Sequence, residues 1–442
     1  MHTAMKGFVK IFTYGCQMND LDTQKLYSEL FKRGYARTEE TTKADIIILN
    51  TCSVRQKAQE KAFSNLGRLK LLKRRTPSLI IAVVGCVAQQ EGTALIERMP
   101  HVDIVLGTHQ LHRLSDILGE VRQHKAHFVD TMYGSCIPSI DIVPEKSFME
   151  PPHRAYINIM QGCNNYCSYC IVPYVRGREI SRNHTSILDE VRLHAARGVK
   201  EIFLLGQNVN SYAGGVTFPA LLKEVHTIEG IERIRFTTSH PKDVNPEFIG
   251  CFATLAKICS HIHLPFQAGS DTVLKAMNRD YTKKGYLELI HDLSEARADI
   301  VFSADVMVGF PRETQGDFEQ TLDLMQAVRF DVLYSFKYSP RPKTFAAGIE
   351  DGVTPEEKRS RLHILQTLQN TISLENNQAR VGRVYDVLVD GTSPRQEDQV
   401  YGRTTHNTIV NFIGSTSLIG TTIRVRVLRA NKNSLTGELL RP

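Results

Sequence analysis

Residues 163–170 read Cys163-Asn164-Asn165-Tyr166-Cys167-Ser168-Tyr169-Cys170 and place three thiols within eight positions. This density of cysteine indicates a site for a soft metal. Zinc normally takes four ligands in a closed site, and the next cysteines, Cys251 and Cys259, do not form a pair at zinc-ribbon spacing. Three thiolates can instead hold a four-iron cluster and leave one iron free to bind a substrate or cosubstrate.

The cysteine stretch follows an apolar segment, residues 155–160, which is predicted to be the first of six strands separated by helical patterns. The other five are residues 201–205, 233–238, 261–266, 300–308 and 331–338. The first helix of the series is expected to be capped by Ser186 and to end at Gly198. Six strand–helix units predict a (β/α)6 barrel that is open on one side, with its active site at the carboxyl ends of the strands.

The first 120 residues also read as strand-then-helix units, with strands predicted at residues 9–13, 45–50, 79–84 and 102–106. Such alternation predicts a parallel sheet. Three of these strands lead into a cysteine, namely Cys16, Cys52 and Cys86. Open parallel sheets bind ligands at the carboxyl ends of their strands, so the three thiols are expected to converge on a cofactor. The alternative is three buried structural cysteines.

A third unit is predicted after a helix that begins near residue 355. Its strand patterns lie at residues 384–389, 408–412 and 423–427, and Arg424 and Arg426 alternate with apolar residues in the last of them. Small basic β-barrels often hold single-stranded RNA, and Tyr385, Tyr401 and Phe412 are expected to be available for stacking. The alternatives are a structural β domain and a protein-binding one.

The predicted fold class is α/β. It comprises an N-terminal parallel-sheet domain (residues 6–122), a proline-containing linker (123–153), an open (β/α)6 barrel (154–376) and a small all-β domain (377–442). Nine cysteines, an odd number, argue against a disulfide framework and favour metal ligation. No apolar run is long enough to span a bilayer, and the first ten residues lack a signal-peptide pattern. We therefore expect a cytoplasmic protein without membrane contact. A monomer is expected as well.

The net charge of +7 is mild, but residues 55–75 hold eight Lys or Arg against a single acid, Glu60. This clustering suits nucleic acid, although a solvated helix face has the same composition. Across this segment and the β domain, the residues expected to bind RNA are Arg55, Lys73, Arg74, Arg424 and Arg426.

The Cys-x3-Cys-x2-Cys spacing, with Tyr169 before its last cysteine, resembles the motif of the radical S-adenosylmethionine (SAM) superfamily. Three further segments resemble the methylthiotransferases of that superfamily: Thr-Tyr-Gly-Cys-Gln-Met-Asn at 13–19, Asn-Thr-Cys-Ser-Val-Arg at 50–55 and Val-Gly-Cys at 84–86. They look most like the branch that acts on N6-isopentenyladenosine in tRNA. The C-terminal unit resembles the TRAM domain of the same family, so the resemblance covers the whole chain in order.

This resemblance implies two 4Fe-4S clusters. One, on Cys163, Cys167 and Cys170, would bind SAM and reduce it to a 5'-deoxyadenosyl radical, and the other, on Cys16, Cys52 and Cys86, would deliver sulfur. A second SAM would supply the methyl group. The implied target is carbon 2 of N6-isopentenyladenosine at position 37 of tRNA, in the anticodon stem-loop. An electron donor such as flavodoxin or ferredoxin is implied, no catalytic residue is expected beyond the cluster ligands, and the sulfur source is open.

Residues expected to contact SAM lie near the predicted carboxyl ends of the barrel strands: Tyr169, Gln207, Asn208, Ser239, Gln267, Ser270 and Asp305. Many radical SAM enzymes carry Gly-Gly-Glu where this chain has Gly206-Gln207-Asn208, so Gln207 or Asn208 is expected to serve instead. A turn or packing role is the alternative for several of the seven. The paired His261 and His263 are expected to face opposite sides of a strand, and Arg341 is a candidate for an anionic group or for the surface.

Two rival functions are considered. The first is a sister methylthiotransferase that acts on threonylcarbamoyl-adenosine in tRNA or on a ribosomal protein, and residues 17–19 and 53–55 weigh against it by resemblance. The second is a zinc-containing RNA-binding protein without catalysis, for which a six-unit barrel would have little use.

Overall fold

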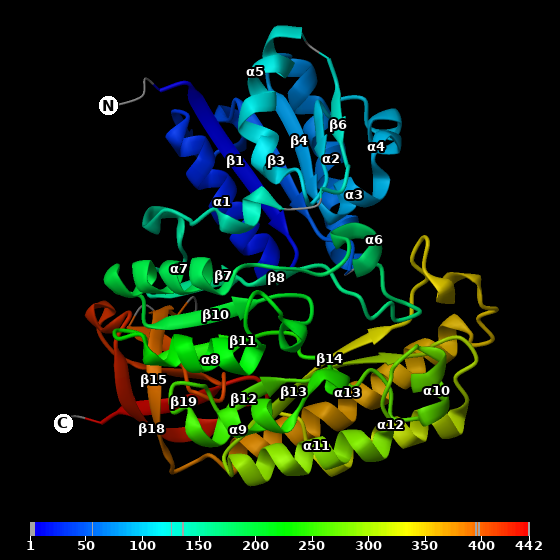
Figure 1. Ribbon diagram of the computed structural model, residues 1–442, viewed down its shortest axis with the longest axis vertical. Coiled ribbons are helices and arrows are strands. Elements are labelled where there is room, and N and C mark those ends of the chain that lie inside the picture. The colour runs from blue at the N-terminus through cyan, green and yellow to red at the C-terminus, as the bar shows by residue number, and fades with distance from the viewer. Residues whose placement is uncertain are drawn as a thin grey trace.

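The computed structural model describes residues 5–54, 56–124, 126–134, 137–393, 396 and 398–440. Three units follow one another along the chain (Figure 1): an N-terminal α/β domain, a central set of strands and helices, and a small β-barrel at one end of the central strands. In the described parts of the chain, no helix is both long and apolar enough to cross a bilayer.

The N-terminal domain is a parallel sheet of six strands in the order β2-β1-β3-β4-β5-β6. Its strands are β1 (Gly7–Tyr14), β2 (Tyr35–Arg37), β3 (Ile46–Thr51), β4 (Ile80–Gly85), β5 (Ile104–Leu106) and β6 (Phe128–Asp130). The four predicted strands are present, and the two edge strands, β2 and β6, were not predicted. Because β6 lies within the stretch expected to be a linker, the sheet extends beyond the predicted boundary at residue 122.

Helices cover both faces of this sheet. Alternate residues of β3 point to opposite faces, so Ile46 and Ile48 pack with helices α1 (Gln17–Lys32) and α5 (Leu114–His124). Ile47 and Leu49 pack on the other face, with α2 (Gln56–Arg75), α3 (Cys86–Glu91) and α4 (Thr93–Arg98). A strand that is buried on both faces must be apolar throughout, and this accounts for the Ile-Ile-Ile-Leu run of β3.

The central unit is a partial barrel of two parallel three-stranded sheets, β11-β10-β7 and β12-β13-β14. They comprise β7 (Arg154–Asn158), β10 (Glu201–Leu205), β11 (Arg233–Phe236), β12 (His261–His263), β13 (Val301–Val308) and β14 (Val332–Lys337). A bridge between Ile234 and Ile258 brings the two sheets together next to β11 and β12. The six predicted strands are therefore confirmed, and β7 and β14 form the two open edges.

Helices lie on the outside of the partial barrel. They are α7 (His184–Ala196), α8 (Phe218–Thr227), α9 (Pro246–Thr254), α10 (Asp271–Ala276), α11 (Lys283–Ala296), α12 (Gln315–Val328) and α13 (Pro355–Gln378). The short helix α6 (Val172–Arg176) instead packs against α3 of the N-terminal domain. A short hairpin of β8 (Met160–Gln161) and β9 (Ile180–Ser181) flanks the cysteine stretch. Helix α7 is capped by Asn183, whose side chain accepts a hydrogen bond from the Thr185 amide, so the predicted cap at Ser186 was wrong.

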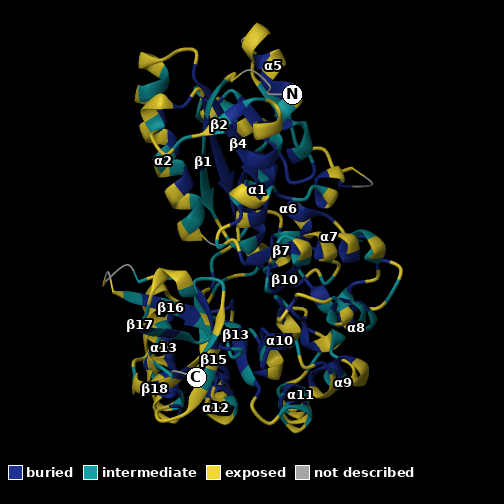
Figure 2. Ribbon diagram, turned by 90° about the vertical axis from the view of Figure 1, so that its left-hand side faces the viewer, coloured by how far each residue is buried: buried dark blue, intermediate teal, exposed yellow. Residues whose placement is uncertain are grey.

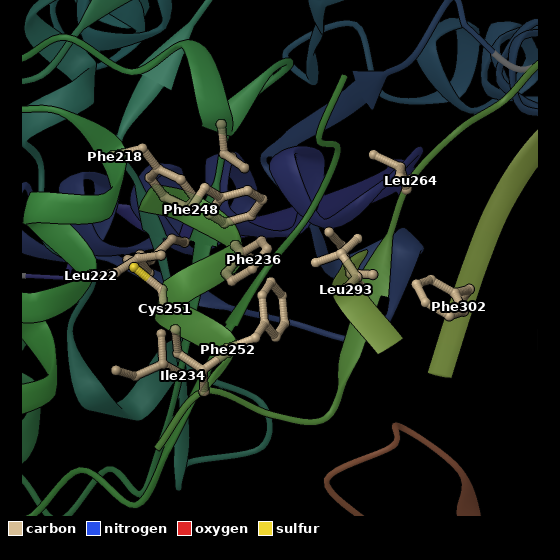
Figure 3. Packing of buried hydrophobic residues seen from close by; sticks show 14 of the residues in the cluster. Phe218, Leu222, Ile234, Phe236, Phe248, Cys251, Phe252, Leu264, Leu293 and Phe302 are labelled. Atoms are coloured by element: carbon tan, nitrogen blue, oxygen red, sulfur yellow. The ribbon is translucent and has the colours of Figure 1, made fainter. Parts of the chain in front are cut away.

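The core between strands and helices is aromatic. Phe218 and Phe248 from two helices surround Phe236 of β11, with ring centroids 5.3–5.6 Å apart, and Phe252 packs against the same ring (Figure 3). Offset and edge-to-face contacts of this kind are favourable beyond simple burial. They hold the helices firmly against the strands whose far ends carry the candidate site.

The C-terminal unit is a closed barrel in the order β15-β16-β17-β19-β18. Its strands are β15 (Val384–Thr392), β16 (Gln399–Arg403), β17 (Ile409–Ile413), β18 (Thr422–Ala430) and β19 (Leu435–Leu439). Val425 and Val427 are buried in its core, while Arg424 and Arg426 point outward. Phe412 is fully buried in that core, so the expectation that it is available for stacking was wrong.

A buried charge network joins this β-barrel to the amino-terminal ends of β7, β10 and β11. Glu201 accepts hydrogen bonds from Arg154 and Arg235, and Arg154 also donates to Asp390 of the β-barrel at 2.8 Å. Arg235 donates in turn to the Thr404 carbonyl at 2.6 Å. The β-barrel therefore closes the end of the central unit opposite to the carboxyl ends of its strands.

Candidate functional site

The three N-terminal cysteines lie together at the carboxyl ends of β1, β3 and β4. Cys16 is the N-cap of α1, Cys52 follows β3, and Cys86 is the first residue of α3. Gly85 allows this arrangement, because its φ is +90° and a Cβ there would lie 2.6 Å from the Thr51 carbonyl oxygen. The convergence expected from the strand ends is therefore present in the structure.

The surroundings of these thiols favour negative charge at one of them. A hydrogen bond from Cys52, aided by Arg176 and by the backbone amides of Met18 and Asn19, lowers the pKa of Cys16 to about 6 despite burial. The same hydrogen bond and burial raise the pKa of Cys52, and burial raises that of Cys86. Cys16 thus ionises easily, whereas Cys52 and Cys86 do not. Further positive charge is needed before all three thiols can ionise, and iron would supply it.

The second set of thiols lies in the loop after β8. The Cys163 amide donates to the Gly177 carbonyl at 3.2 Å, and the Cys170 amide donates to the Cys167 carbonyl at 2.9 Å. Gly162 precedes the loop with φ +89°, and a Cβ there would lie 2.0 Å from the Arg178 carbonyl oxygen. Burial raises the pKa of Cys163 to about 11 and that of Cys170 to about 12, so their ionisation also calls for a metal.

Arg279 lies beside this loop and was missed by sequence reasoning. Its guanidinium is buried and donates to the Cys167 sulfur at 3.5 Å and to the Pro265 carbonyl at 2.9 Å. Nothing in the sequence marks this arginine, because 112 positions separate it from Cys167. It supplies a fixed positive charge next to a cysteine ligand candidate.

Several buried polar atoms at the carboxyl ends of the barrel strands have no hydrogen-bond partner within the described chain. They belong to Asn158, Gln161, Ser239, His240 and Tyr338. Unsatisfied buried groups are costly, so a cluster of them at one end of a barrel indicates a polar ligand. SAM, with its amino acid and ribose groups, fits this donor and acceptor set. Asn158, Gln161, His240 and Tyr338 were not among the residues predicted to contact it.

The thiols do not form a site for a single ion. Among the described residues, no three His, Cys, Asp or Glu side chains converge tightly enough to hold one metal. A four-iron cluster is itself several ångström wide, so its three thiolates lie farther apart than the ligands of zinc. Each set offers three cysteines, which is the number of thiolates that such a cluster needs when one iron is left open.

Of the seven residues predicted to contact SAM, three form side-chain hydrogen bonds within the fold and a fourth, Ser239, does not. Asn208 donates to Asp243 at 2.7 Å and accepts from the His240 amide, while Ser270 donates to Asp317 and caps α10, so both are engaged in the fold. Gln207 accepts from the Gly162 amide at 2.6 Å and thereby holds the start of the cysteine loop. Ser239 retains a free hydroxyl at the strand ends.

The remaining three predicted SAM contacts have other surroundings. Tyr169 packs against the small hydrophobic cluster that contains Ala268 and Phe310, and burial raises its pKa well above the usual value. Gln267 has φ +63° and bonds through its backbone to β13. Asp305 lies on the inner face of β13, where His263 is 3.5 Å from its carboxylate.

The prediction that His261 and His263 face opposite sides of β12 was wrong. Both rings hydrogen-bond to the Ser303 hydroxyl, at 2.8 and 2.9 Å, and so lie on the same face. Residues two apart on a strand share a face, which the prediction overlooked. His263 also contacts the ring of Tyr334 on β14, with centroids 5.9 Å apart.

Arg341 does not lie free on the surface. It follows β14 and donates to the Val54 carbonyl at 3.1 Å and to Gln59 at 3.4 Å, so it connects the barrel to the segment after Cys52. It therefore helps to hold the N-terminal thiols over the open barrel.

The residues expected to bind RNA have different environments. Arg74 is exposed on α2, which lies on the outside of the N-terminal domain (Figure 2). Lys73 is instead paired with Asp103 at 2.8 Å, which favours a structural role. Arg424 and Arg426 are exposed on β18, and Arg426 lies 3.6 Å from Glu438. Arg55 lies outside the described residues.

Three family models match the chain in order: the uncharacterized protein family UPF0004 over residues 8–107, the radical SAM superfamily over 157–325, and the TRAM domain over 378–440. In fold, the chain is similar to the radical SAM methyltransferase TsrM from Kitasatospora setae, with a TM-score of 0.56 at 15% identity over 78% of this chain and 74% of that one. It is also similar to the cobalamin-dependent radical SAM enzyme OxsB, with a TM-score of 0.52 at 14% identity over 83% of this chain and 57% of that chain. Fold and thiol sets together define a radical SAM iron–sulfur enzyme with a TRAM domain.

Curated relatives narrow the class. The chain is 50% identical to the tRNA-2-methylthio-N(6)-dimethylallyladenosine synthase of Geobacter sulfurreducens, over 98% of this chain and 97% of the relative. It is 46% identical to the synthase of the same name from Clostridium botulinum, over 97% of this chain and 96% of the relative. The chain belongs to this family of radical SAM methylthiotransferases, whose cofactors are SAM and 4Fe-4S clusters.

Proposed function

We propose that this chain adds a methylthio group to carbon 2 of N6-isopentenyladenosine at position 37 of tRNA, next to the anticodon. One observation carries the proposal. Two sets of three cysteines lie in two different domains, and the helix α6, which begins two residues after Cys170, packs against α3, which begins at Cys86. A reaction that needs both radical generation and sulfur delivery requires two such sites close together.

Cys163, Cys167 and Cys170 would hold the cluster that works with SAM, and Cys16, Cys52 and Cys86 would hold the other. When bound, these groups supply a radical that abstracts hydrogen, and they supply the sulfur. An acid or base of the chain could not remove hydrogen from an unactivated aromatic C–H bond. The chain itself orients SAM through Ser239 and the other unpartnered groups at the strand ends. It also excludes water by packing Met18 and Leu21 of α1 against Phe203 and Leu205 on the inner face of β10.

The inner face of β14 offers a place for the target base. Leu333 packs toward the helices, so Val332 and Tyr334 face the barrel interior, where each is 44% exposed. Tyr334 pairs in register with Asp305 and touches His263. An adenine stacked on Tyr334 could donate its remaining N6–H to Asp305, because isopentenylation leaves one such hydrogen. We therefore assign Asp305 to the target base rather than to SAM.

The partners follow from this chemistry. The TRAM domain and the family indicate a tRNA substrate, which meets the enzyme through its anticodon stem-loop. An electron donor such as flavodoxin or ferredoxin, a monomeric state and a cytoplasmic location remain parts of the proposal. The sulfur source is open.

The test is a reaction on synthetic anticodon stem-loops with anaerobically prepared protein, SAM and a chemical reductant. About eight irons per chain are expected from two four-iron clusters. Nucleoside mass spectrometry should detect the methylthio product on the N6-isopentenyladenosine stem-loop and none on the threonylcarbamoyl-adenosine one. Product only on the latter would favour the sister activity, and zinc without iron would contradict the radical mechanism.

A further inference from the structure

Arg176 reaches from the radical SAM domain into the N-terminal thiol site. It ends α6, six residues after Cys170, and its side chain is buried. The backbone around it is clamped to the N-terminal domain, because Thr108 donates to the Val175 carbonyl at 2.7 Å and His109 bonds to the Arg176 carbonyl at 3.0 Å. The position of the guanidinium is thus fixed by both domains.

The guanidinium is only partly satisfied there. One nitrogen, Nη2, donates to Asp22 at 3.4 Å, and Ile171 and Val175, which lie near Arg176 on the chain, pack against Cys86. Burial alone would lower the pKa of Arg176, but the nearby Cys86, Asp22 and Cys16 raise it. The other terminal nitrogen, Nη1, is buried and has no partner among the described residues. A buried guanidinium has five donors, and leaving donors unused costs free energy unless a ligand takes them up.

The chemistry of the site indicates what that ligand is. Three thiolates leave an oxidised four-iron core with a net negative charge, and reduction or an added sulfide makes the site more negative. Asp22 adds to this negative charge. Arg176 is a buried cation whose charge acts on both Cys86 and Cys16 and lowers the pKa of each thiol against the effect of burial.

We propose that Arg176 is a positioning residue for sulfur delivery, which holds the anionic sulfur ligand of the N-terminal cluster and stabilises the cluster's reduced state. This inference rests on the proposed function, since it presumes a cluster on Cys16, Cys52 and Cys86. A merely structural arginine would serve only to join the two domains through Asp22. The two roles predict different electrochemistry.

The experiment uses the full-length chain with Cys163, Cys167 and Cys170 replaced by alanine, so that only the N-terminal cluster remains. The reduction potential of that cluster is measured by EPR-monitored titration, with and without sodium sulfide. Arg176→Met should lower the reduction potential of the cluster by at least about 59 mV, which is a tenfold change in the equilibrium constant of a one-electron reduction. The same variant should bind sulfide at least tenfold more weakly. Arg176→Lys keeps the positive charge, so its reduction potential and its affinity for sulfide should stay close to those of the wild-type residue.

Asp22→Asn is the matched control. It breaks the same ion pair but removes a negative charge, so it should raise the potential while Arg176→Met lowers it. Shifts of opposite sign support the proposal. An unchanged potential in Arg176→Met, or shifts of the same sign in the two variants, would overturn it. The reduction potential is measured without tRNA. If the wild-type enzyme failed to modify its stem-loop, the proposed function would be rejected, but the conclusion about Arg176 would not change.

Discussion

A buried arginine lies near each set of cysteines, and in both cases the arginine comes from a distant part of the chain. Arg279 donates to the Cys167 sulfur, and the charge of Arg176 acts on Cys86 and Cys16. Fixed positive charge stabilises thiolates and raises the potential of a bound cluster. The two sites nevertheless differ in their thiols, because the pKa of Cys16 is lowered to about 6 whereas burial raises the pKa values of Cys163 and Cys170.

Single cysteine variants should separate the two steps of the reaction. Cys167→Ala is expected to abolish all SAM cleavage, since it removes a ligand of the cluster that activates SAM. Cys52→Ala should leave SAM cleavage intact and prevent sulfur insertion. Chromatography of 5'-deoxyadenosine and mass spectrometry of the nucleoside measure the two outcomes, and methylthiolated product from either variant would contradict the two-cluster model.

Variants on the inner face of the barrel should change recognition of the base. Asp305→Asn and Tyr334→Leu are each expected to weaken binding of the N6-isopentenyladenosine stem-loop by roughly tenfold, as loss of a hydrogen bond or of base stacking would do. A stem-loop without a base at position 37 can make neither contact, so its affinity should not change. Fluorescence anisotropy with both stem-loops measures the two affinities. Equal weakening toward both stem-loops would instead indicate general damage, and Ser335→Ala on the outer face of β14 is the control.

At the level of elements, the sequence pattern identified those strands that are long and buried. β3, β4 and β10 were predicted within two residues because apolar runs with β-branched residues between helical patterns leave little alternative. β2 and β6 have three residues each, too few for a periodic signal. The convergence of Cys16, Cys52 and Cys86 followed from the rule on strand ends, whereas Arg279, Asn158 and Gln161 required the folded chain, since no local pattern marks them.

The docking of the TRAM barrel should depend on pH through Glu201. Burial alone would raise the pKa of Glu201, but Arg235 and Arg154 overcome this and lower it to about 2. The carboxylate therefore contributes stability that is complete above its ordinary pKa of about 4.3 and is lost as the pH falls toward 2. Urea unfolding followed between pH 5 and pH 2 should show this loss.

Glu201→Gln tests the origin of that pH dependence. The variant removes the carboxylate bonded to Arg235 and one of the two carboxylates bonded to Arg154, so at pH 7 it should be destabilised by about 3–5 kcal/mol. The difference from wild type should shrink as the pH falls from 5 to 2. A constant difference across that range would show that the charge of Glu201 does not drive the docking.

At the level of the whole molecule, the two extra domains meet different parts of the central unit. The TRAM barrel covers the amino-terminal ends of β7, β10 and β11, and the N-terminal domain packs on the inner face of the barrel and near its carboxyl ends. An RNA that presents one base to the barrel interior is thus expected to extend across more than one domain. Its affinity should come mainly from phosphate contacts with exposed arginines rather than from the base.

The arginines of β18 should therefore set the salt dependence of binding. Replacing Arg424 and Arg426 together by alanine is expected to weaken stem-loop binding and to reduce the slope of log K against log salt by about 1 for each phosphate that the protein no longer neutralises. Arg74→Ala should act in the same direction, whereas Lys73→Ala should lower stability because Lys73 is paired with Asp103. Arg192→Ala, an exposed change on α7, is the control. An unchanged slope in the β18 double variant would mean that RNA follows another face of the molecule, because a protein that neutralises fewer phosphates must also release fewer counterions.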